Sequence, residues 1–174
     1  MGWRVPDREA NLIQIRIVTK GGRIVSPPLN GVAGDEFGMG ILVSRTNDER
    51  VTGLTENIDS NISGPVSGVA LSEFPTDGDA VWFQEINANT VLEGQVATGS
   101  ADDVAGSRGT LTYDATTGNY SVNLASAVNA SIEVVASEPN YHNVGHPKSG
   151  GDYNLVRFKF LPAVLDIAPA AVSS

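Results

Sequence analysis

Apolar and polar residues alternate with a period of two along much of this 174-residue chain, which is the pattern of half-buried β-strands. In the segment 11–18, NLIQIRIV, the residues Ile13, Ile15 and Ile17 would share one face, so we expect a strand over Leu12–Val18 with these side chains buried together. The pattern continues in further segments: MGILVS (39–44), AVWFQEI (80–86), TVLEGQVA (90–97), GTLTY (109–113), YSVNLA (120–125), SIEVVA (131–136) and YNLVRFKFL (153–161).

Turn-forming residues separate these segments, as expected for short strands joined by tight corners. The pairs concerned are Asn30-Gly31, Asp77-Gly78, Thr117-Gly118 and Gly150-Gly151. Apolar residues at helical spacing are scarce, and the two best helical segments, DREAN (7–11) and LSEF (71–74), are too short to be stable alone. The pattern therefore predicts an all-β fold, a compact antiparallel β-barrel or sandwich with extended N- and C-terminal arms.

Three parts of the chain are expected from the distribution of Pro and small residues. These interrupt any regular pattern in residues 1–11 and again in residues 162–174, which we interpret as an N-terminal arm and a C-terminal tail. Residues 12–161 are expected to form a single β domain, because a chain of this length suits one domain.

The strand 80–86 contains two adjacent aromatic residues, Trp82 and Phe83. Successive side chains of a strand point to opposite faces, so one ring is expected to fill the core and the other to meet a second surface. A subunit interface is one such surface.

Composition narrows the range of partners. The chain has 20 Asp and Glu against 11 Lys and Arg, a formal net charge of −9, and its basic residues are scattered. Nucleic acid and an anionic membrane surface are therefore not expected to bind it. Cysteine is absent, which excludes disulfides and thiolate chemistry. Because the N-terminal segment lacks the apolar core of a signal peptide, we expect synthesis in the cytoplasm.

Two groups of polar residues resemble metal ligands only superficially. His142 and His146 are four residues apart, with Asp152 six further on, but Gly145 and Pro147 argue against the helix that would bring both rings to one side. A calcium cage would need distant carboxylates to converge, and its candidates are Asp77 and Asp79 with Asp35, Glu36 or Glu73. An Asp-Gly turn explains this sequence without an ion, so we expect neither a metal nor a cofactor.

Catalytic motifs are equally weak. The segment GDEFGMGI (34–41) is glycine-rich but lacks the Lys-Ser or Lys-Thr of a phosphate-binding loop. Around Ser67, SGPVSG has Pro65 where a nucleophile elbow needs glycine. Glycoside chemistry stays open, since it needs two carboxylates that meet, and Glu85, Glu93 and Glu133 all lie on expected strands. We expect that the protein is not an enzyme.

Three segments follow one another in a characteristic order: PVSGVALSEFPTDGDAVWFQEI (65–86), VLEGQVATGSADDVAGSRGTLTYDATTGNYSV (91–122) and HNVGHPKSGGDYNLVRFKFLP (142–162). They contain a Gly-Val-Ala segment and a strand, then an Asp-Ala-Thr hairpin, then a final Gly-Asp strand. Over roughly 64–161 this order resembles the capsid cement, or head decoration, proteins of tailed bacteriophages. Residues 12–61 and 125–143 are longer than the family pattern requires.

The resemblance implies a compact β-barrel without an active site, bound to the outer surface of an assembled virion. In such a role the partner is the major capsid protein, whose subunits the bound protein ties together, often as a homotrimer at local threefold positions. The residues we expect to contact the capsid or a neighbouring subunit are Trp3, Arg4 and Arg8 of the N-terminal arm and Trp82 of the domain.

Two other function classes remain open at this point. One is a different β-rich virion component, such as a tail or fibre-base protein, which would form rings through strand pairing between subunits. The other is a carbohydrate-binding β module, which is disfavoured because aromatic residues make up only 6% of the chain.

Overall fold

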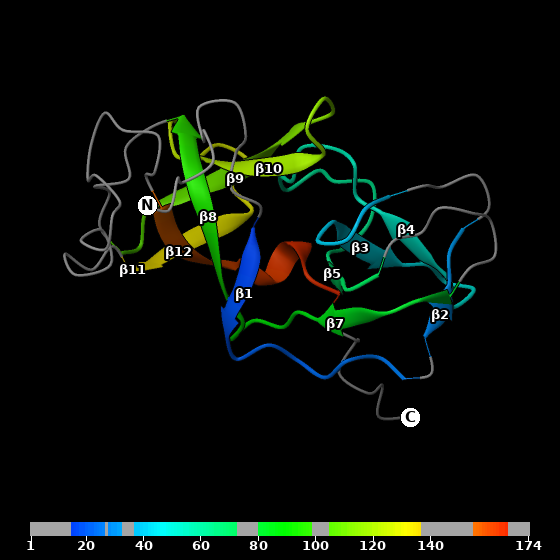
Figure 1. Cartoon of the computed structure of the whole chain (residues 1–174). Coiled ribbons are helices and arrows are strands. Elements are labelled where there is room, and N and C mark those ends of the chain that lie inside the picture. Colours follow the sequence, from blue (N-terminus) through cyan, green and yellow to red (C-terminus); the bar gives the residue numbers. More distant parts are fainter. Residues whose placement is uncertain are drawn as a thin grey trace, which may run out of the picture.

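The computed structural model describes residues 15–26, 28–32, 37–72, 80–98, 105–136 and 155–166, and the structural statements below concern these residues. In this part of the chain β-strands form one closed barrel and two smaller sheets (Figure 1). The only helical element among them is a short 3-10 turn, η1 (Pro162–Val164). The all-β barrel expected from the sequence is therefore confirmed.

Five strands form the barrel, which closes because its last strand pairs with its first. They are β8 (Val91–Thr98), β9 (Arg108–Asp114), β10 (Asn119–Asn123), β11 (Ile132–Ala136) and β12 (Leu155–Phe160). The order is β8-β10-β9-β11-β12, and β12 returns to β8. Neighbours are antiparallel except β10, which runs parallel to β8. A further strand, β1 (Arg16–Thr19), pairs with β8 outside this ring.

The barrel interior is filled by the apolar residues of the alternating pattern. Leu92, Leu111, Val122 and Phe158 are fully buried. A glycine, Gly94 of β8, lies against these side chains, since a Cβ there would lie 3.0 Å from Val122 Cγ2 and 3.1 Å from Phe158 Cε1. A side chain at this position would therefore force its neighbours to shift.

The second body consists of shorter strands. Its four-stranded antiparallel sheet has the order β4 (Val51–Gly53), β3 (Leu42–Arg45), β5 (Gly68–Ala70), β7 (Phe83–Glu85), and β2 (Leu29–Asn30) pairs with β6 (Ala80–Val81) beside it. We call the four-stranded sheet the small sheet. Within it, Gly68 permits close strand approach, because a Cβ there would lie 2.3 Å from the carbonyl oxygen of Gln84.

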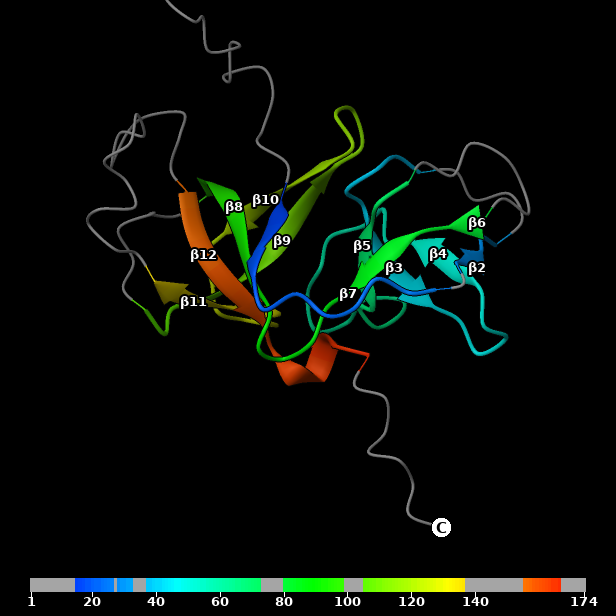
Figure 2. The same ribbon diagram turned by 60° about the horizontal axis from the view of Figure 1, so that its bottom comes forward.

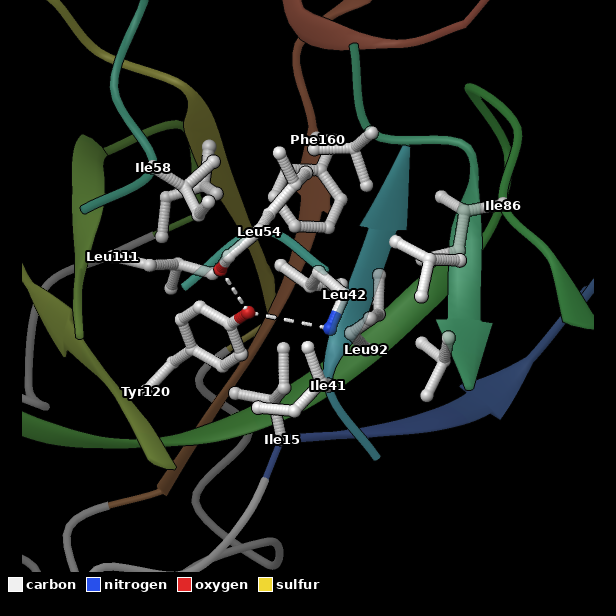
Figure 3. Close-up of a cluster of buried hydrophobic side chains, with 14 of the residues drawn as sticks. Ile15, Ile41, Leu42, Leu54, Ile58, Ile86, Leu92, Leu111, Tyr120 and Phe160 are labelled. Atoms are coloured by element: carbon white, nitrogen blue, oxygen red, sulfur yellow. Dashed lines mark hydrogen bonds between the residues drawn. The ribbon is translucent and has the colours of Figure 1, made fainter. Parts of the chain in front are cut away.

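Tyr120 of β10 joins the barrel to the small sheet (Figure 3). Its buried hydroxyl accepts a hydrogen bond from the Leu42 N–H at 3.3 Å and donates one to the Leu54 carbonyl oxygen. Burial raises the pKa of Tyr120 above its ordinary value of 10.0, because the charged phenolate would lose its hydration. The hydroxyl is thus a neutral bridge between two backbone groups that would otherwise be buried without partners.

A connecting segment, residues 54–66, reinforces this junction. Ile58 forms an antiparallel bridge with Leu111 of β9, with N–H to oxygen distances of 2.9 and 3.0 Å. The Ile58 carbonyl also accepts a bond from the buried Ser131 hydroxyl, and Asn57 Oδ1 accepts one from the Tyr113 N–H at 2.8 Å. The segment therefore holds the small sheet and the barrel against each other through backbone hydrogen bonds.

Most of the expected strands are present, with some shifts of boundary. The N-terminal strand covers Arg16–Thr19 rather than Leu12–Val18; Ile15 is buried, Ile17 is partly buried, and residues 12–14 lie outside the described part of the chain. The expected turn at Thr117-Gly118 is confirmed, with Gly118 at a φ of +71°. The pairs at 77–78 and 150–151 and the segment 7–11 lie outside the described residues.

Three expectations were wrong. Asn30-Gly31 is no turn, because Asn30 belongs to β2 and Gly31 bridges Val51. Leu71, expected in a helical turn, continues the ladder beyond β5 by donating its N–H to the Trp82 oxygen at 2.7 Å.

The expected C-terminal tail also begins too early, at Pro162. The turn η1 follows β12 toward the small sheet (Figure 2), and Val164 and Leu165 are buried. Leu165 then bridges Val66. Proline here starts a 3-10 turn instead of ending the packed domain.

Candidate functional site

An exposed apolar surface lies on the small sheet, and we call Ile24, Leu71 and Trp82 the Trp82 surface. The side chains are exposed by 53%, 38% and 42% respectively. Leu71 lies directly opposite Trp82, as the hydrogen bond between their backbones shows. Ile24 lies opposite Gln84, with which it forms an isolated bridge, and Gln84 is two residues after Trp82 and so points to the same face. Cross-strand neighbours share a face, so the three exposed side chains lie on the same face.

The alternation expected at 82–83 explains why Trp82 faces outward. Phe83 is fully buried on the opposite face of the strand, where the Arg45 guanidinium lies 5.7 Å from its ring centroid. The backbone between β6 and β7 is fixed, since the Trp82 N–H donates to Ser72 Oγ at 3.0 Å. Trp82 is therefore held in hydrogen-bonded backbone between two strands and not in a free loop.

A cleft of about 650 Å³, lined by both polar and apolar residues, opens where the small sheet meets the barrel, and we call it the junction cleft. Its walls are the turn after β3, the turn between β7 and β8, and the residues that follow η1. These elements are distant in sequence, so the cleft exists only when barrel and small sheet are packed together.

Charged groups in the junction cleft are connected by two sets of bonds. Glu85 accepts ion pairs from Arg45 at 3.2 Å and from Arg23 at 3.4 Å. Ser67 Oγ accepts a hydrogen bond from the backbone N–H of Arg45 at 2.8 Å, and the Ser67 hydroxyl donates one to Asp166 Oδ2 at 3.0 Å. Ser67 is thus a buried structural hydroxyl that ties the residue after η1 to the small sheet.

The three strand carboxylates considered for glycoside chemistry are compensated separately. Glu93 pairs with Arg16 at 3.2 Å, and Glu133 pairs with Arg108 at 3.1 Å. Glu85 has its own two arginines in the junction cleft. In the described part of the chain these ion pairs use different arginines for each carboxylate, so they do not draw the three carboxylates together.

Of the residues expected to contact a capsid or subunit, the structure describes Trp82 alone. Trp3, Arg4 and Arg8 lie outside the described residues, as do the metal candidates His142, His146, Asp152, Asp77, Asp79, Asp35, Glu36 and Glu73. Among the residues that are described, no three His, Cys, Asp or Glu side chains come together as a metal site.

Sequence reasoning missed Ile24 and Leu71 as partners of Trp82, and it missed the junction cleft entirely. The signal for Leu71 was present, since an apolar residue follows the Gly-Val-Ala strand, but we assigned it to a helical turn. The cleft residues come from turns, whose Asn and Thr side chains are equally typical of turn chemistry.

Within the described ranges, no helix is long and apolar enough to cross a membrane. Comparison of the chain with protein-family models and with curated proteins found no match to either.

Proposed function

We propose that this protein is a structural virion protein that binds the outside of an assembled phage capsid and stabilises it by bridging subunits of the major capsid protein. The observation that carries the proposal is the Trp82 surface. It consists of three exposed apolar side chains, one of them a tryptophan, on one face of paired strands. The resemblance of the segments within 64–161 to capsid cement proteins supports the same role.

The physical basis is that a few residues of a protein interface carry most of its binding free energy. Tryptophan is enriched among the few residues that dominate binding, and apolar neighbours around it exclude water. The described residues carry nine acidic and eight basic side chains, so this part of the chain is nearly neutral although the whole chain carries −9. Apolar contact therefore dominates at the Trp82 surface, and many copies on one lattice add their weak contacts.

Two finer features belong to the same proposal. The protein acts on the capsid as a homotrimer, so each site engages several shell subunits at once. The N-terminal arm adds Trp3 as an apolar anchor, and Arg4 and Arg8 pair with acidic groups of the shell. No enzymatic step and no cofactor enters this function.

The test uses expanded shells of the phage that encodes the protein. Saturating full-length protein is expected to raise the temperature at which the shells rupture, because a ligand that prefers the assembled state stabilises it by mass action. Trp82→Ser is expected to weaken shell binding by at least about 30-fold, the loss of roughly 2 kcal/mol typical of an interface hot spot.

Val128→Ser is the matched control, because Val128 is 74% exposed and lies in the turn between β10 and β11, away from the Trp82 surface. It is expected to bind and protect shells as the parent protein does. Shells that neither bind the intact protein nor gain stability from it would contradict the proposed function. Equal shell binding by Trp82→Ser and Val128→Ser would show that the Trp82 surface is not the docking face.

A further inference from the structure

We propose that the junction cleft is a binding site for an extended peptide segment that carries a lysine or arginine side chain. The cation pairs with Asp166, and the peptide backbone pairs with the carboxamides of Asn47, Asn87 and Asn89. The inference goes beyond the proposed function, because it concerns a different face and a different kind of contact from the Trp82 surface.

Asp166 is the group of the cleft that would accept a cation. In the part of the lining that the structure describes, Arg45 is the one basic residue, and its guanidinium is paired with Glu85. Glu85 is paired a second time with Arg23, so both arginines are directed at Glu85 and not at Asp166. Asp166 receives one hydrogen bond, from the neutral Ser67 hydroxyl to Oδ2, and among the described residues no cation pairs with it. A lysine or arginine at Asp166 Oδ1 would give this carboxylate a cationic partner through a charge-assisted bond.

The carboxamides select a peptide backbone. Asn47 lies on the turn after β3, while Asn87 and Asn89 lie on the turn between β7 and β8, and all three are exposed and line the cleft. Among the described residues the side chains of Asn47 and Asn89 make no hydrogen bond, and the Asn87 side chain uses only its oxygen, which accepts the Asn89 N–H at 2.8 Å. A carboxamide offers both a donor and an acceptor, as a peptide group requires.

The cleft is pre-organised for this ligand. Thr90 Oγ1 accepts the Asn87 N–H at 3.0 Å and donates to the Lys20 oxygen at 2.9 Å, which fixes the turn that carries Asn87 and Asn89. On the other wall the Thr46 N–H donates to the Arg50 oxygen at 2.9 Å, closing the turn around Asn47. Rigid walls reduce the entropy that binding would otherwise lose.

A sugar fits less well. Among the lining residues that the structure describes, none is aromatic and able to stack on a sugar ring. The apolar part of the lining includes Ile86 and Leu165, which suit one aliphatic side chain beside the cation. The volume of about 650 Å³ lies within the range of about 300–1,000 Å³ that small-ligand sites occupy.

The test is an NMR titration of the full chain, without shells, with the blocked tetrapeptide Ala-Val-Arg-Ala and with its counterpart Ala-Val-Glu-Ala. The arginine peptide is expected to shift the backbone amides of Asn47, Asn87, Asn89 and Asp166 in a saturable way. The glutamate peptide is expected to leave them in place. Absence of saturable binding, or equal binding of both peptides, would overturn the proposal.

Variants locate the cation. Asp166→Asn keeps an acceptor for Ser67 and is expected to weaken the arginine peptide about tenfold, as the loss of a charge-assisted bond does. Glu133→Gln on β11 removes the same charge outside the cleft and is the matched control, expected to bind as the parent does. Asn89→Ala, at an exposed position, tests the contact between the carboxamide and the peptide backbone separately, and it is expected to weaken peptide binding about threefold. Unchanged affinity in Asp166→Asn and Asn89→Ala would refute the site.

This result is separable from the proposed function. Trp82→Ser is expected to bind the arginine peptide as the parent protein does, because Trp82 is not among the residues that line the junction cleft. The same variant is expected to bind shells weakly. Loss of peptide binding in Trp82→Ser would contradict the assignment of two independent surfaces.

Discussion

The barrel and the small sheet are built from strands of different length and close in different ways. Barrel strands run five to eight residues and pair around a complete ring, so each strand has neighbours on both sides. Strands of the small sheet run three or four residues, and in the part of the chain that the structure describes its outer strands are flanked by isolated bridges, from 24 to 84 and from 31 to 51. Closure makes the barrel self-sufficient, whereas the small sheet depends on its neighbours.

This difference explains where binding surfaces can exist. A closed barrel buries its apolar face inside itself. The small sheet meets the barrel near Leu42 and Leu54 through Tyr120, while farther along Ile24, Leu71 and Trp82 stay exposed. The dependent sheet therefore supplies the apolar surface, and its junction with the barrel supplies the cleft.

The largest expected effect comes from emptying either core. Phe158→Ala in the barrel and Phe83→Ala in the small sheet each remove a fully buried ring, and each is expected to lower the free energy of unfolding by about 3–5 kcal/mol. Because one hydrophobic core connects both bodies, urea unfolding should remain a single transition in both variants. A separate early transition in Phe83→Ala alone would show that the small sheet unfolds independently.

A smaller effect is expected when only the bridge between the two bodies is cut. Tyr120→Phe leaves the Leu42 N–H and the Leu54 carbonyl without their partner, which should cost about 2 kcal/mol of stability. Hydrogen exchange should quicken in β3 more than in β12, because β12 is held inside the closed ring. Equal acceleration in both strands would remove the distinction between a self-sufficient barrel and a dependent sheet.

The same hydroxyl gives the junction a pH dependence at high pH. The pKa of Tyr120 is raised in the folded protein above its ordinary 10.0. Its contribution to the free energy of unfolding is therefore complete below pH 10 and is lost as the pH rises from there toward the folded pKa. The stability difference between the parent and Tyr120→Phe should shrink by about 1.4 kcal/mol per pH unit above 10. Chemical unfolding of both proteins at pH 9 and pH 11 measures it, and a constant difference would contradict the assignment.

The barrel was largely predictable from the sequence because alternation over five or more residues specifies both a strand and its buried face. The segments 90–97, 109–113 and 131–136 contained such runs and became β8, β9 and β11. The outward position of Trp82 followed from the same rule applied to its neighbour Phe83.

The small sheet was predictable only in part, since two- and three-residue strands carry too little pattern. Asn30 has the preferences of a turn residue, yet pairing with Ala80 places it in a strand. Pro162 should end regular structure, yet burial of Val164 and Leu165 keeps the next residues in the domain. The junction cleft has no local signature, because Asn47, Asn89 and Asp166 meet through tertiary contacts alone.

Hydrogen exchange of the full-length protein, free and bound to expanded shells, tests most directly whether the Trp82 surface is the docking face. Binding is expected to add protection in residues 69–72 and 80–84 and to leave the hairpin tip at 115–118 unchanged. Protection confined to the barrel hairpin, or none in 80–84 on saturated shells, would contradict this expectation.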